Sequence, residues 1–557
     1  MLNTKLLHSL QRVFPNDCPQ NETLSLSGVR NERLSFQLAY RMKDPQITTP
    51  IFIQIESELP INLYATEFVP VKHTGAAGFE NPPAIGLYPD ILCPKATNPE
   101  IQFLNVPGTS KRYNEKGENY ILNASGDCWQ SIWFNINEQE KIIPAGEFTV
   151  TLHIFDAMGR NEVETRKMTV KIEDAVLPEQ TLIYTNWLHC DCICDLHHVA
   201  IFSEEFWRIL ESYLQTAATF GMNMVLMPAF TPELDTPIGT ERMTVQLVDV
   251  GKTQAGYRFD FSKMKRFAAL CKKVGIQYLE HAHLFSQWGA TAAPKIVDTD
   301  GNLLFGWETD AAGEEYGKFL KEYLNALLAF LKQEDLEQSI FFHISDEPKD
   351  FMLEAYQKAT EQVRELLKDF NSGDALSHYC FYEDGTVKTP IVRTKAIDEF
   401  AGRCDNMWAY YTGNDVQDGL SNRILTVPPE RNRIMGIQLY QYKMKGFLHW
   451  GLNYYYDVLS NGIFDPRTNP CGYRNHAGTS FFVYPNFDGT ASPSMRQVVF
   501  GDGLNDYRSL QALEQKHGRR FCEKLIEKYF GKMTVHTLPE TPETILNFRA
   551  ELNQLLV

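Results

Sequence analysis

Two adjacent acidic residues give the strongest chemical signal in this sequence. Asp346 and Glu347 directly follow the apolar segment 339–345, and Pro348 then ends the strand pattern. Neighbouring residues within a strand point to opposite faces, but where the chain bends at a strand end both can line one cleft. Burial and mutual repulsion then raise the pKa of one carboxyl group, which can serve as a general acid. Such a pair of acids is suited to cleaving a glycosidic bond.

A purely structural interpretation of these residues is also open. Pro suits the first position of a helix, and acidic side chains are stabilised near a helix N-terminus. Asp346, Glu347 and Pro348 could therefore simply begin a helix. The buried-strand pattern that precedes them favours the chemical interpretation.

The sequence lacks an obvious second carboxylate to act as nucleophile. A conventional retaining glycosidase needs one about 5 Å from the acid. Segments 406–412 and 445–451, the sixth and seventh strand candidates, contain no acidic residue. We therefore predict substrate-assisted hydrolysis, in which the 2-acetamido oxygen of the sugar attacks its own anomeric carbon. Asp346 would orient the acetamido group, and Glu347 would protonate the leaving oxygen and later activate water.

Aromatic and amide side chains gather near the predicted strand ends, where they could bind a sugar. Aromatic rings offer apolar faces that match the C–H faces of a sugar, and polar side chains can bind its hydroxyl groups. Each such residue could equally be an ordinary core residue. The predicted substrate-binding residues are Trp450, Tyr410, Asn453, His283, Trp288 and Asn186.

Strand and helix patterns alternate from about residue 181 and predict a (β/α)8 barrel, the class of fold that places its chemistry at the carboxyl ends of its strands. No glycine-rich phosphate-binding loop is present, which argues against nucleotide binding. The strand candidates are 182–187, 222–228, 276–281, 339–344, 375–380, 406–410, 445–450 and 480–484. The helix candidates among them are 204–220, 261–274, 314–331 and 351–367.

The regions on either side of the barrel have different patterns. Residues 1–178 contain short strand-like runs closed by turn residues, which predicts an accessory β-sandwich. We assign 179–490 to the catalytic barrel and 491–557 to C-terminal helices packed on it. The first of these helices, 494–516, is expected to be interrupted at 501–503 by two glycines.

Composition excludes several classes of protein. The 557 residues carry a net charge of −17, so nucleic acid is not an expected partner. No apolar run reaches 18 residues and the N-terminal segment lacks a secretory pattern, which predicts a cytoplasmic protein without a membrane span. The partner expected from the acidic pair is a small glycan or glycoconjugate substrate. Cys190, Cys192 and Cys194 would share one face of an extended segment, but they lack metal-site spacing. We expect buried free thiols, with no metal and no cofactor.

The segment 343–348 (HISDEP) resembles the catalytic motif of glycoside hydrolase family 123. Further agreement lies in RNE at 30–32, QSIW at 130–133, GFLHWG at 446–451 and DGLNDY at 502–507. The resemblance implies a β-sandwich, a (β/α)8 barrel and an exo-acting β-N-acetylgalactosaminidase, with the family's adjacent acids at Asp346 and Glu347. One departure is Gly501, where an Arg is expected. An N-acetylglucosaminidase, a two-carboxylate glycosidase and a non-catalytic glycan-binding protein stay open as alternatives.

Overall fold

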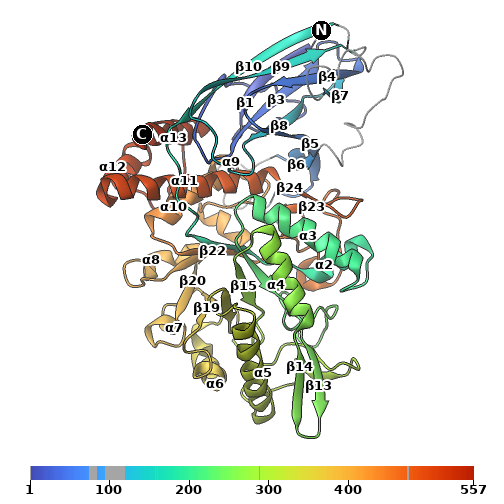
Figure 1. Cartoon of the computed structure of the whole chain (residues 1–557), viewed down its shortest axis with the longest axis vertical. Helices are drawn as coiled ribbons and strands as arrows, with labels where there is room; N and C mark the ends of the chain where they lie inside the picture. The colour runs from blue at the N-terminus through green and yellow to red at the C-terminus, as the bar shows by residue number, and fades with distance from the viewer. Residues whose placement is uncertain are drawn as a thin grey trace.

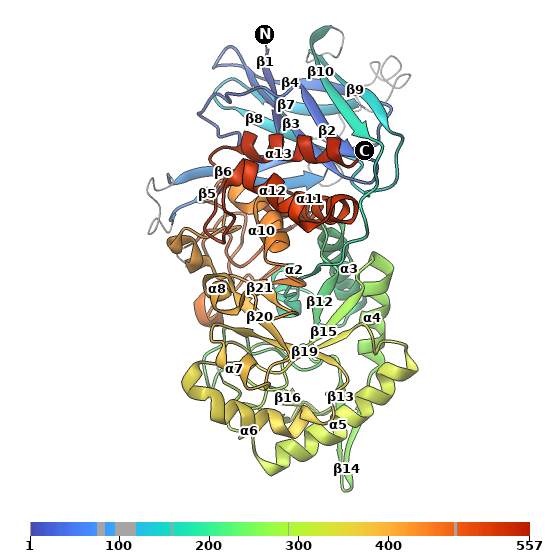
Figure 2. The ribbon, with the colours of Figure 1, turned by 90° about the vertical axis from the view of Figure 1, so that its left-hand side faces the viewer.

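The computed structural model describes residues 2–74, 84–94, 119–156, 159, 161–287, 289–472 and 476–557. A strand-rich N-terminal region lies at one end and a closed parallel barrel at the other (Figure 1). Three C-terminal helices lie between them in both views (Figure 2). They are α11 (Met495–His517), α12 (Arg519–Phe530) and α13 (Pro542–Leu555).

The N-terminal region is a sandwich of two five-stranded sheets, as predicted. Apolar side chains that alternate along the strands fill the space between the sheets, as in β3, where Phe36 and Leu38 are buried. One sheet has the order β1-β3-β8-β5-β6: Leu2–His8, Leu34–Met42, Gln130–Ile136, Ile61–Val71 and Gly86–Pro94. The other has the order β2-β10-β9-β4-β7: Ser25–Val29, Glu162–Glu173, Gly146–Phe155, Thr48–Glu56 and Asn119–Ser125.

Eight parallel strands close into the predicted barrel. They are short and largely buried, because helices or loops cover the outside and side chains fill the inside. In order around the barrel they are β11 (Ile183–Asn186), β12 (Met224–Met227), β15 (Tyr278–His281), β18 (Ile340–His343), β19 (Asn371–Leu376), β20 (Thr389–Arg393), β21 (Trp408–Tyr410) and β22 (Gly446–His449).

The predicted number of barrel strands is right, but one predicted member is wrong, and the strand expected at 375–380 lies earlier, at Asn371–Leu376. The segment 480–484 contributes to β23 (Val483–Pro485), which pairs with β24 (Ala491–Pro493) outside the barrel. The missed strand is β20, which contains Pro390 and is flanked only by the short helices α7 (Cys380–Glu383) and α8 (Ile397–Phe400). Without long helices, the βα rhythm that identifies the other strands is lost there. The strands at 406–410 and 445–450 are therefore the seventh and eighth.

Longer helices cover the first half of the barrel. Ser203 caps α3 by accepting a hydrogen bond from the backbone N–H of Phe206, and Gly275 ends α4 in the left-handed conformation. These helices are α2 (Cys190–His197), α3 (Glu204–Thr219), α4 (Ser262–Val274), α5 (Glu314–Gln333) and α6 (Leu353–Arg364). Two shorter helices, α9 (Pro429–Arg433) and α10 (Met435–Gln441), follow in the sequence between β21 and β22. Short 3-10 helices are η1 (Asp350–Met352), η2 (Thr394–Ala396), η3 (Gly413–Asp418) and η4 (Val458–Ser460). Two hairpins lie outside the barrel: β13 (Asp249–Thr253) pairs with β14 (Gly256–Asp260), and β16 (Ile296–Val297) pairs with β17 (Leu303–Phe305).

The three clustered cysteines lie on a helix and not on an extended segment, so that prediction is wrong. Cys190, Cys192 and Cys194 are free and buried in α2, whose first five residues are all buried. Burial on every side removes the exposed face by which a helical pattern is normally recognised. Burial also raises the pKa of the Cys190 and Cys192 thiols well above the usual range. Across the described residues, no group of three or more His, Cys, Asp or Glu side chains is arranged to hold a metal ion.

Helix α11 runs without interruption through Gly501 and Gly503, contrary to the prediction. Both glycines permit close contacts rather than breaks: a Cβ on Gly501 would meet Arg33, and a Cβ on Gly503 would lie 2.8 Å from the Arg433 carbonyl oxygen. The closest approach is at Gly436 of α10, where a Cβ would lie 1.8 Å from the Gly503 carbonyl oxygen. Glycine therefore sets the distance between α10 and α11.

Replacing Gly436 with alanine is expected to destabilise the protein by about 3 kcal/mol, since the clash is with backbone and neither helix can yield locally. Urea unfolding followed by circular dichroism measures the change. Gly317→Ala is the matched control: its Cβ would meet only the end of the Gln362 side chain, and the change should stay under about 1 kcal/mol. Equal stability of the two variants would contradict this account.

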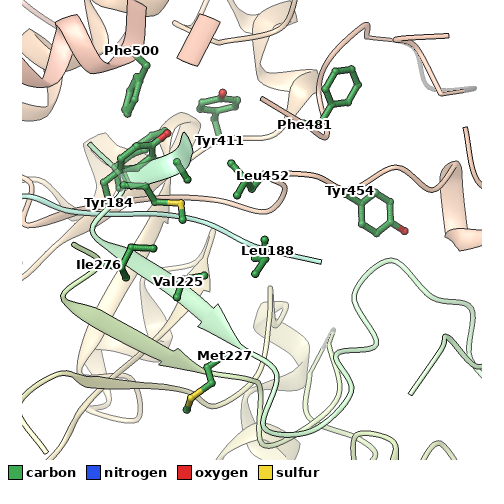
Figure 3. Packing of buried hydrophobic residues seen from close by; sticks show 14 of the residues in the cluster. Tyr184, Leu188, Val225, Met227, Ile276, Tyr411, Leu452, Tyr454, Phe481 and Phe500 are labelled. Atoms are coloured by element: carbon green, nitrogen blue, oxygen red, sulfur yellow. The ribbon is translucent and has the colours of Figure 1, made fainter. Parts of the chain in front are cut away.

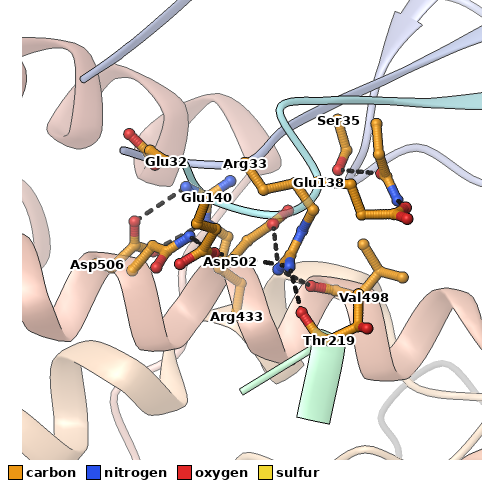
Figure 4. Close-up of polar contacts among 12 residues, drawn as sticks. Glu32, Arg33, Ser35, Glu138, Glu140, Thr219, Arg433, Val498, Asp502 and Asp506 are labelled. Carbon is orange, nitrogen blue, oxygen red and sulfur yellow. Dashed lines mark hydrogen bonds and ion pairs between the residues drawn. The ribbon is translucent and has the colours of Figure 1, made fainter. Parts of the chain in front are cut away.

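Buried ion pairs join the sandwich to the C-terminal helices (Figure 4). Arg33, which lies between β2 and β3, pairs with Asp502 of α11 at 3.3 Å. Arg549 of α13 pairs with Glu32 at 2.7 Å and with Asp506 at 3.0 Å. The sequence segments 30–32 and 502–507 thus form an interface between domains.

One large apolar core extends through the barrel and into α11. Figure 3 shows Tyr184 of β11 close to Phe500 of α11, and their ring centroids are 4.8 Å apart. This contact fixes the barrel against the helical layer. Among the residues that the structure describes, none lies in a helix long and apolar enough to cross a lipid bilayer.

Candidate active site

A cavity of about 360 Å³ opens at the carboxyl ends of the barrel strands. Its walls come from the residues at or after seven of the eight strands, which is where barrel enzymes place their active sites. The lining residues are Trp187, Leu234, Asp235, Gln287, Asp346, Glu347, Ala375, Tyr410, Thr412, Gly413, Asn414, Leu448, Trp450, Val458, His476 and Thr479.

Asp346 and Glu347 both line this cavity and both are half-buried. The chain bends sharply after β18, and Glu347 adopts a φ of 42°, a left-handed conformation that non-glycine residues rarely adopt. Such strain is typical of functional sites, where the surrounding structure holds it in place. The hydroxyl of Tyr410 donates a hydrogen bond of 2.6 Å to Glu347 Oε1. The bend and this bond fix the second acid of the pair.

A buried polar layer supports the acidic pair from below. The backbone N–H groups of Ile344 and Ser345 donate to Asp374 Oδ1 at 2.8 and 3.0 Å. His343 lies between Asp374 and Glu280, with its Nε2 2.7 Å from Glu280 Oε1 and its Nδ1 3.3 Å from Asp374 Oδ1. Burial opposes protonation of this ring, but the two carboxylates raise the pKa of His343 to about 10. His343 is therefore a buried cation directly before the loop that carries Asp346 and Glu347.

The acidic pair retains a proton more readily than isolated carboxyl groups would. Burial, and then repulsion from Glu347, raise the pKa of Asp346 well above that of an ordinary aspartic acid, while His343 acts in the opposite direction. Two acids held side by side cannot both be ionised at little cost.

Aromatic rings form part of the cavity wall. Trp450 and Tyr410, both expected from the sequence, line it together with Trp187. The indole N–H of Trp187 donates to Glu280 Oε1 at 2.7 Å, and the Trp450 ring packs edge-on against Tyr454 with centroids 5.3 Å apart. These contacts hold the rings in fixed positions, as a site for a sugar ring requires.

Three of the residues expected to bind substrate lie elsewhere, and a fourth is outside the described residues. The side chain of Asn453 exchanges hydrogen bonds with the backbone of His189, and that of Asn186 contacts Tyr184 and Arg423. Both are fully buried and do not line the cavity. Each supports a loop or strand instead of a ligand.

His283 is also buried outside the cavity lining, with its ring centroid 4.6 Å from that of His343. Burial and the charge of His343 lower the pKa of His283 well below its usual value, so the ring is neutral. The remaining candidate, Trp288, lies outside the described residues.

Several polar residues of the cavity were not found from the sequence. Asn414 follows β21, so its position after a predicted strand end could have identified it from the sequence as a cavity residue. Asp235, His476 and Thr479 lie in long loops, where no periodic pattern indicates which way a side chain points. Both ring nitrogens of His476 and the hydroxyl of Thr479 are buried without a hydrogen-bond partner among the described residues. Groups of this kind are available to a polar ligand.

Paired acids, aromatic walls and a cavity at the mouth of a closed barrel together define the site of a glycoside hydrolase. A family model confirms this class: residues 187–513 match the catalytic domain of glycoside hydrolase family 123. The chain belongs to this family and is a glycoside hydrolase.

Comparison with solved structures agrees in fold over the whole chain. A family 123 glycoside hydrolase from Clostridium perfringens, described in a study of glycolipid glycan hydrolysis, covers 100% of this chain and 97% of its own, with 14% identity and a TM-score of 0.71. A β-glucuronidase from Bacteroides uniformis covers 92% of this chain and 50% of its own, with 10% identity and a TM-score of only 0.29. No curated protein matches the sequence.

Proposed function

We propose that this glycoside hydrolase releases terminal β-linked N-acetylhexosamine, with N-acetylgalactosamine as the preferred sugar, by substrate-assisted retaining hydrolysis. The observation that carries the proposal is the pair Asp346 and Glu347 on one aromatic-walled cavity. The similarity to the Clostridium perfringens family 123 enzyme, which was described in a study of glycolipid glycan hydrolysis, supports a glycoconjugate substrate. The cavity volume of about 360 Å³ suits one terminal sugar and the bond to its neighbour.

In the proposed mechanism, the acetamido N–H of the bound sugar donates to Asp346. Accepting this bond favours the ionised form of Asp346, and the single proton of the pair then belongs on Glu347. Glu347 protonates the leaving oxygen while the acetamido oxygen attacks the anomeric carbon. The bond to the leaving group breaks and a cyclic oxazolinium forms, whose positive charge Asp346 stabilises. Glu347 then removes a proton from a water molecule as its oxygen attacks the anomeric carbon. The bond between that carbon and the acetamido oxygen breaks, which opens the oxazolinium ring with net retention at the anomeric carbon.

A third carboxylate, Asp235, lines the cavity and is the candidate nucleophile of a conventional retaining mechanism. Its Oδ2 already accepts hydrogen bonds from the Tyr454 hydroxyl at 3.3 Å and from the Leu459 backbone N–H at 3.2 Å. These bonds stabilise the carboxylate charge and reduce its nucleophilicity. Two adjacent acids are better suited to the substrate-assisted roles, because both can reach one bound sugar, Asp346 at its acetamido group and Glu347 at its leaving oxygen.

A panel of p-nitrophenyl glycosides tests the proposal. We expect turnover of the β-N-acetylgalactosaminide, slower turnover of the β-N-acetylglucosaminide and none of the plain β-galactoside, because only the first two carry the attacking acetamido oxygen. A thiazoline mimic of the cyclic intermediate should inhibit. Hydrolysis of the β-galactoside, or full activity at a high concentration of the thiazoline, would contradict substrate assistance.

The dependence of kcat/KM on pH should reflect the shared proton of the acidic pair. The reactive form carries one proton, so activity should fall at low pH, when a second proton binds, and at high pH, when the last one is lost. Because the pKa of Asp346 is raised, the alkaline limb should lie well above the range of free carboxyl groups. An alkaline limb near pH 4 would contradict this assignment. Tyr410→Phe, which removes the hydrogen bond to Glu347, should shift the profile.

A further inference from the structure

We propose that a second cavity, beside the active site, is a binding subsite for a further neutral sugar unit of the substrate glycan. This inference rests on the proposed function and extends it to the length of the glycan that the enzyme binds. The cavity has a volume of about 290 Å³ and lies between the segment 231–236, which follows β12, and the segment 303–309 at β17. Its size is sufficient for a small ligand.

The two cavities share one wall. Within the segment 231–236, Leu234 and Asp235 line the active site, whereas Glu233 and Thr236 line the second cavity. Gln287 of the active site fixes this wall: its Nε2 donates to the Glu233 carbonyl oxygen at 3.3 Å, and its Oε1 accepts from the Asp235 backbone N–H at 3.1 Å. The cavities are therefore separated by a single chain segment, so one branched or extended glycan can occupy both.

Glu233 is a buried carboxyl group in the wall of the second cavity, and one of its oxygens is unsatisfied. The residue is only 8% exposed, and its Oε1 has no hydrogen-bond partner among the residues described by the structure. Burial raises the pKa of Glu233 to about 8, so the carboxyl group is mostly neutral at pH 7. An unsatisfied buried polar atom is costly unless a ligand satisfies it. A neutral carboxyl group both donates and accepts hydrogen bonds, which matches a hydroxyl-bearing ligand.

The charges around the second cavity argue against an anionic ligand. Lys295 Nζ lies 2.6 Å from Glu241, and Arg242 lies 2.7 Å from Asp191. Both cations that line the cavity are thus neutralised by carboxylates of the chain. An anionic ligand would therefore find no unpaired cation in this lining among the described residues.

Aromatic side chains complete the chemistry expected of a sugar subsite. Phe305 is buried in the wall, and Trp307 is half-buried, with its indole N–H donating to the Thr240 carbonyl oxygen at 2.9 Å. That bond holds the Trp307 ring in place without using its faces. A fixed indole face beside a neutral carboxyl group is suited to the C–H face and hydroxyl groups of a hexose.

Kinetics with a short and a long substrate test the proposal. The short one is the p-nitrophenyl β-N-acetylhexosaminide, and the long one is a neutral tetrasaccharide with the same terminal sugar. For each variant, kcat/KM for the tetrasaccharide is divided by kcat/KM for the aryl glycoside. In Trp307→Ala and in the conservative Glu233→Gln this ratio should fall about tenfold, because the KM for the tetrasaccharide rises. Phe487→Ala, a fully exposed aromatic elsewhere, and the exposed Glu337→Gln should leave the ratio unchanged. An unchanged ratio in both cavity variants overturns the subsite.

Calorimetric binding separates this proposal from the proposed function. If the wild-type enzyme hydrolyses neither substrate, the proposed function is contradicted. The subsite is then tested by titrating the tetrasaccharide into the wild-type protein and into the Trp307→Ala variant. Binding that weakens about tenfold in the variant supports the subsite. No binding to the wild type at millimolar tetrasaccharide, or equal binding to both proteins, overturns it. Thermal melting establishes that each variant is folded.

Discussion

Glu347→Gln should lower kcat for substrates with poor leaving groups by about 10²- to 10⁴-fold, the range for removal of a general acid. Activated aryl glycosides should lose far less in the first step, since their leaving oxygen needs no proton. The amide preserves the shape of the side chain and its contact with Tyr410. The measurement is a plot of log kcat/KM against the pKa of the leaving phenol, whose slope should become steeper in the variant.

The control for this experiment is Glu337→Gln, an exposed carboxyl group that precedes β18 at the opposite end of the strand. It should leave both the rate and the slope unchanged. If Glu347→Gln reduced the rate equally for every leaving group, Glu347 would not be the general acid. In that case the raised pKa of Asp346 would make Asp346 the next candidate for that role.

Asp346→Asn should lower kcat by about 10²- to 10³-fold for good and poor leaving groups alike. The carboxylate is proposed to stabilise the oxazolinium charge, and that charge develops whatever the leaving group is. The variant should also bind a thiazoline mimic more weakly, by a similar factor, because the mimic carries the same charge when protonated. Steady-state kinetics and inhibition constants, measured on the same preparation, provide both values.

Asp235→Asn is the comparison that separates the two mechanisms. Under substrate assistance, Asp235 contributes to the cavity wall and its replacement should cost at most about tenfold. If Asp235 were the nucleophile, Asp235→Asn would remove nearly all turnover and a fluorinated glycoside would label the wild-type protein at this residue. A loss larger than that of Asp346→Asn would therefore overturn the substrate-assisted mechanism.

The sequence was sufficient where the pattern is local. The apolar run before Asp346 and Glu347 ends in a strand of four buried residues, and the two acids line the cavity mouth as expected from the bend. The strand-rich first third and the βα rhythm of the remainder predict the sandwich and the barrel, because alternating burial imposes a period on the sequence. The strand β20 was not predicted, because its neighbouring helices are short and Pro390 interrupts its pattern.

What the sequence by itself determined is therefore the class of fold and the position of the acidic pair, since strand ends and adjacent acids are features of one continuous segment. Only the tertiary structure decided which distant residues meet that pair. Asp235 and His476 reach the cavity from long loops, whereas Asn186 and Asn453 turn into the supporting structure. The physical reason is that side-chain direction in a loop is set by packing and hydrogen bonds with remote segments, which leave no periodic trace in the chain.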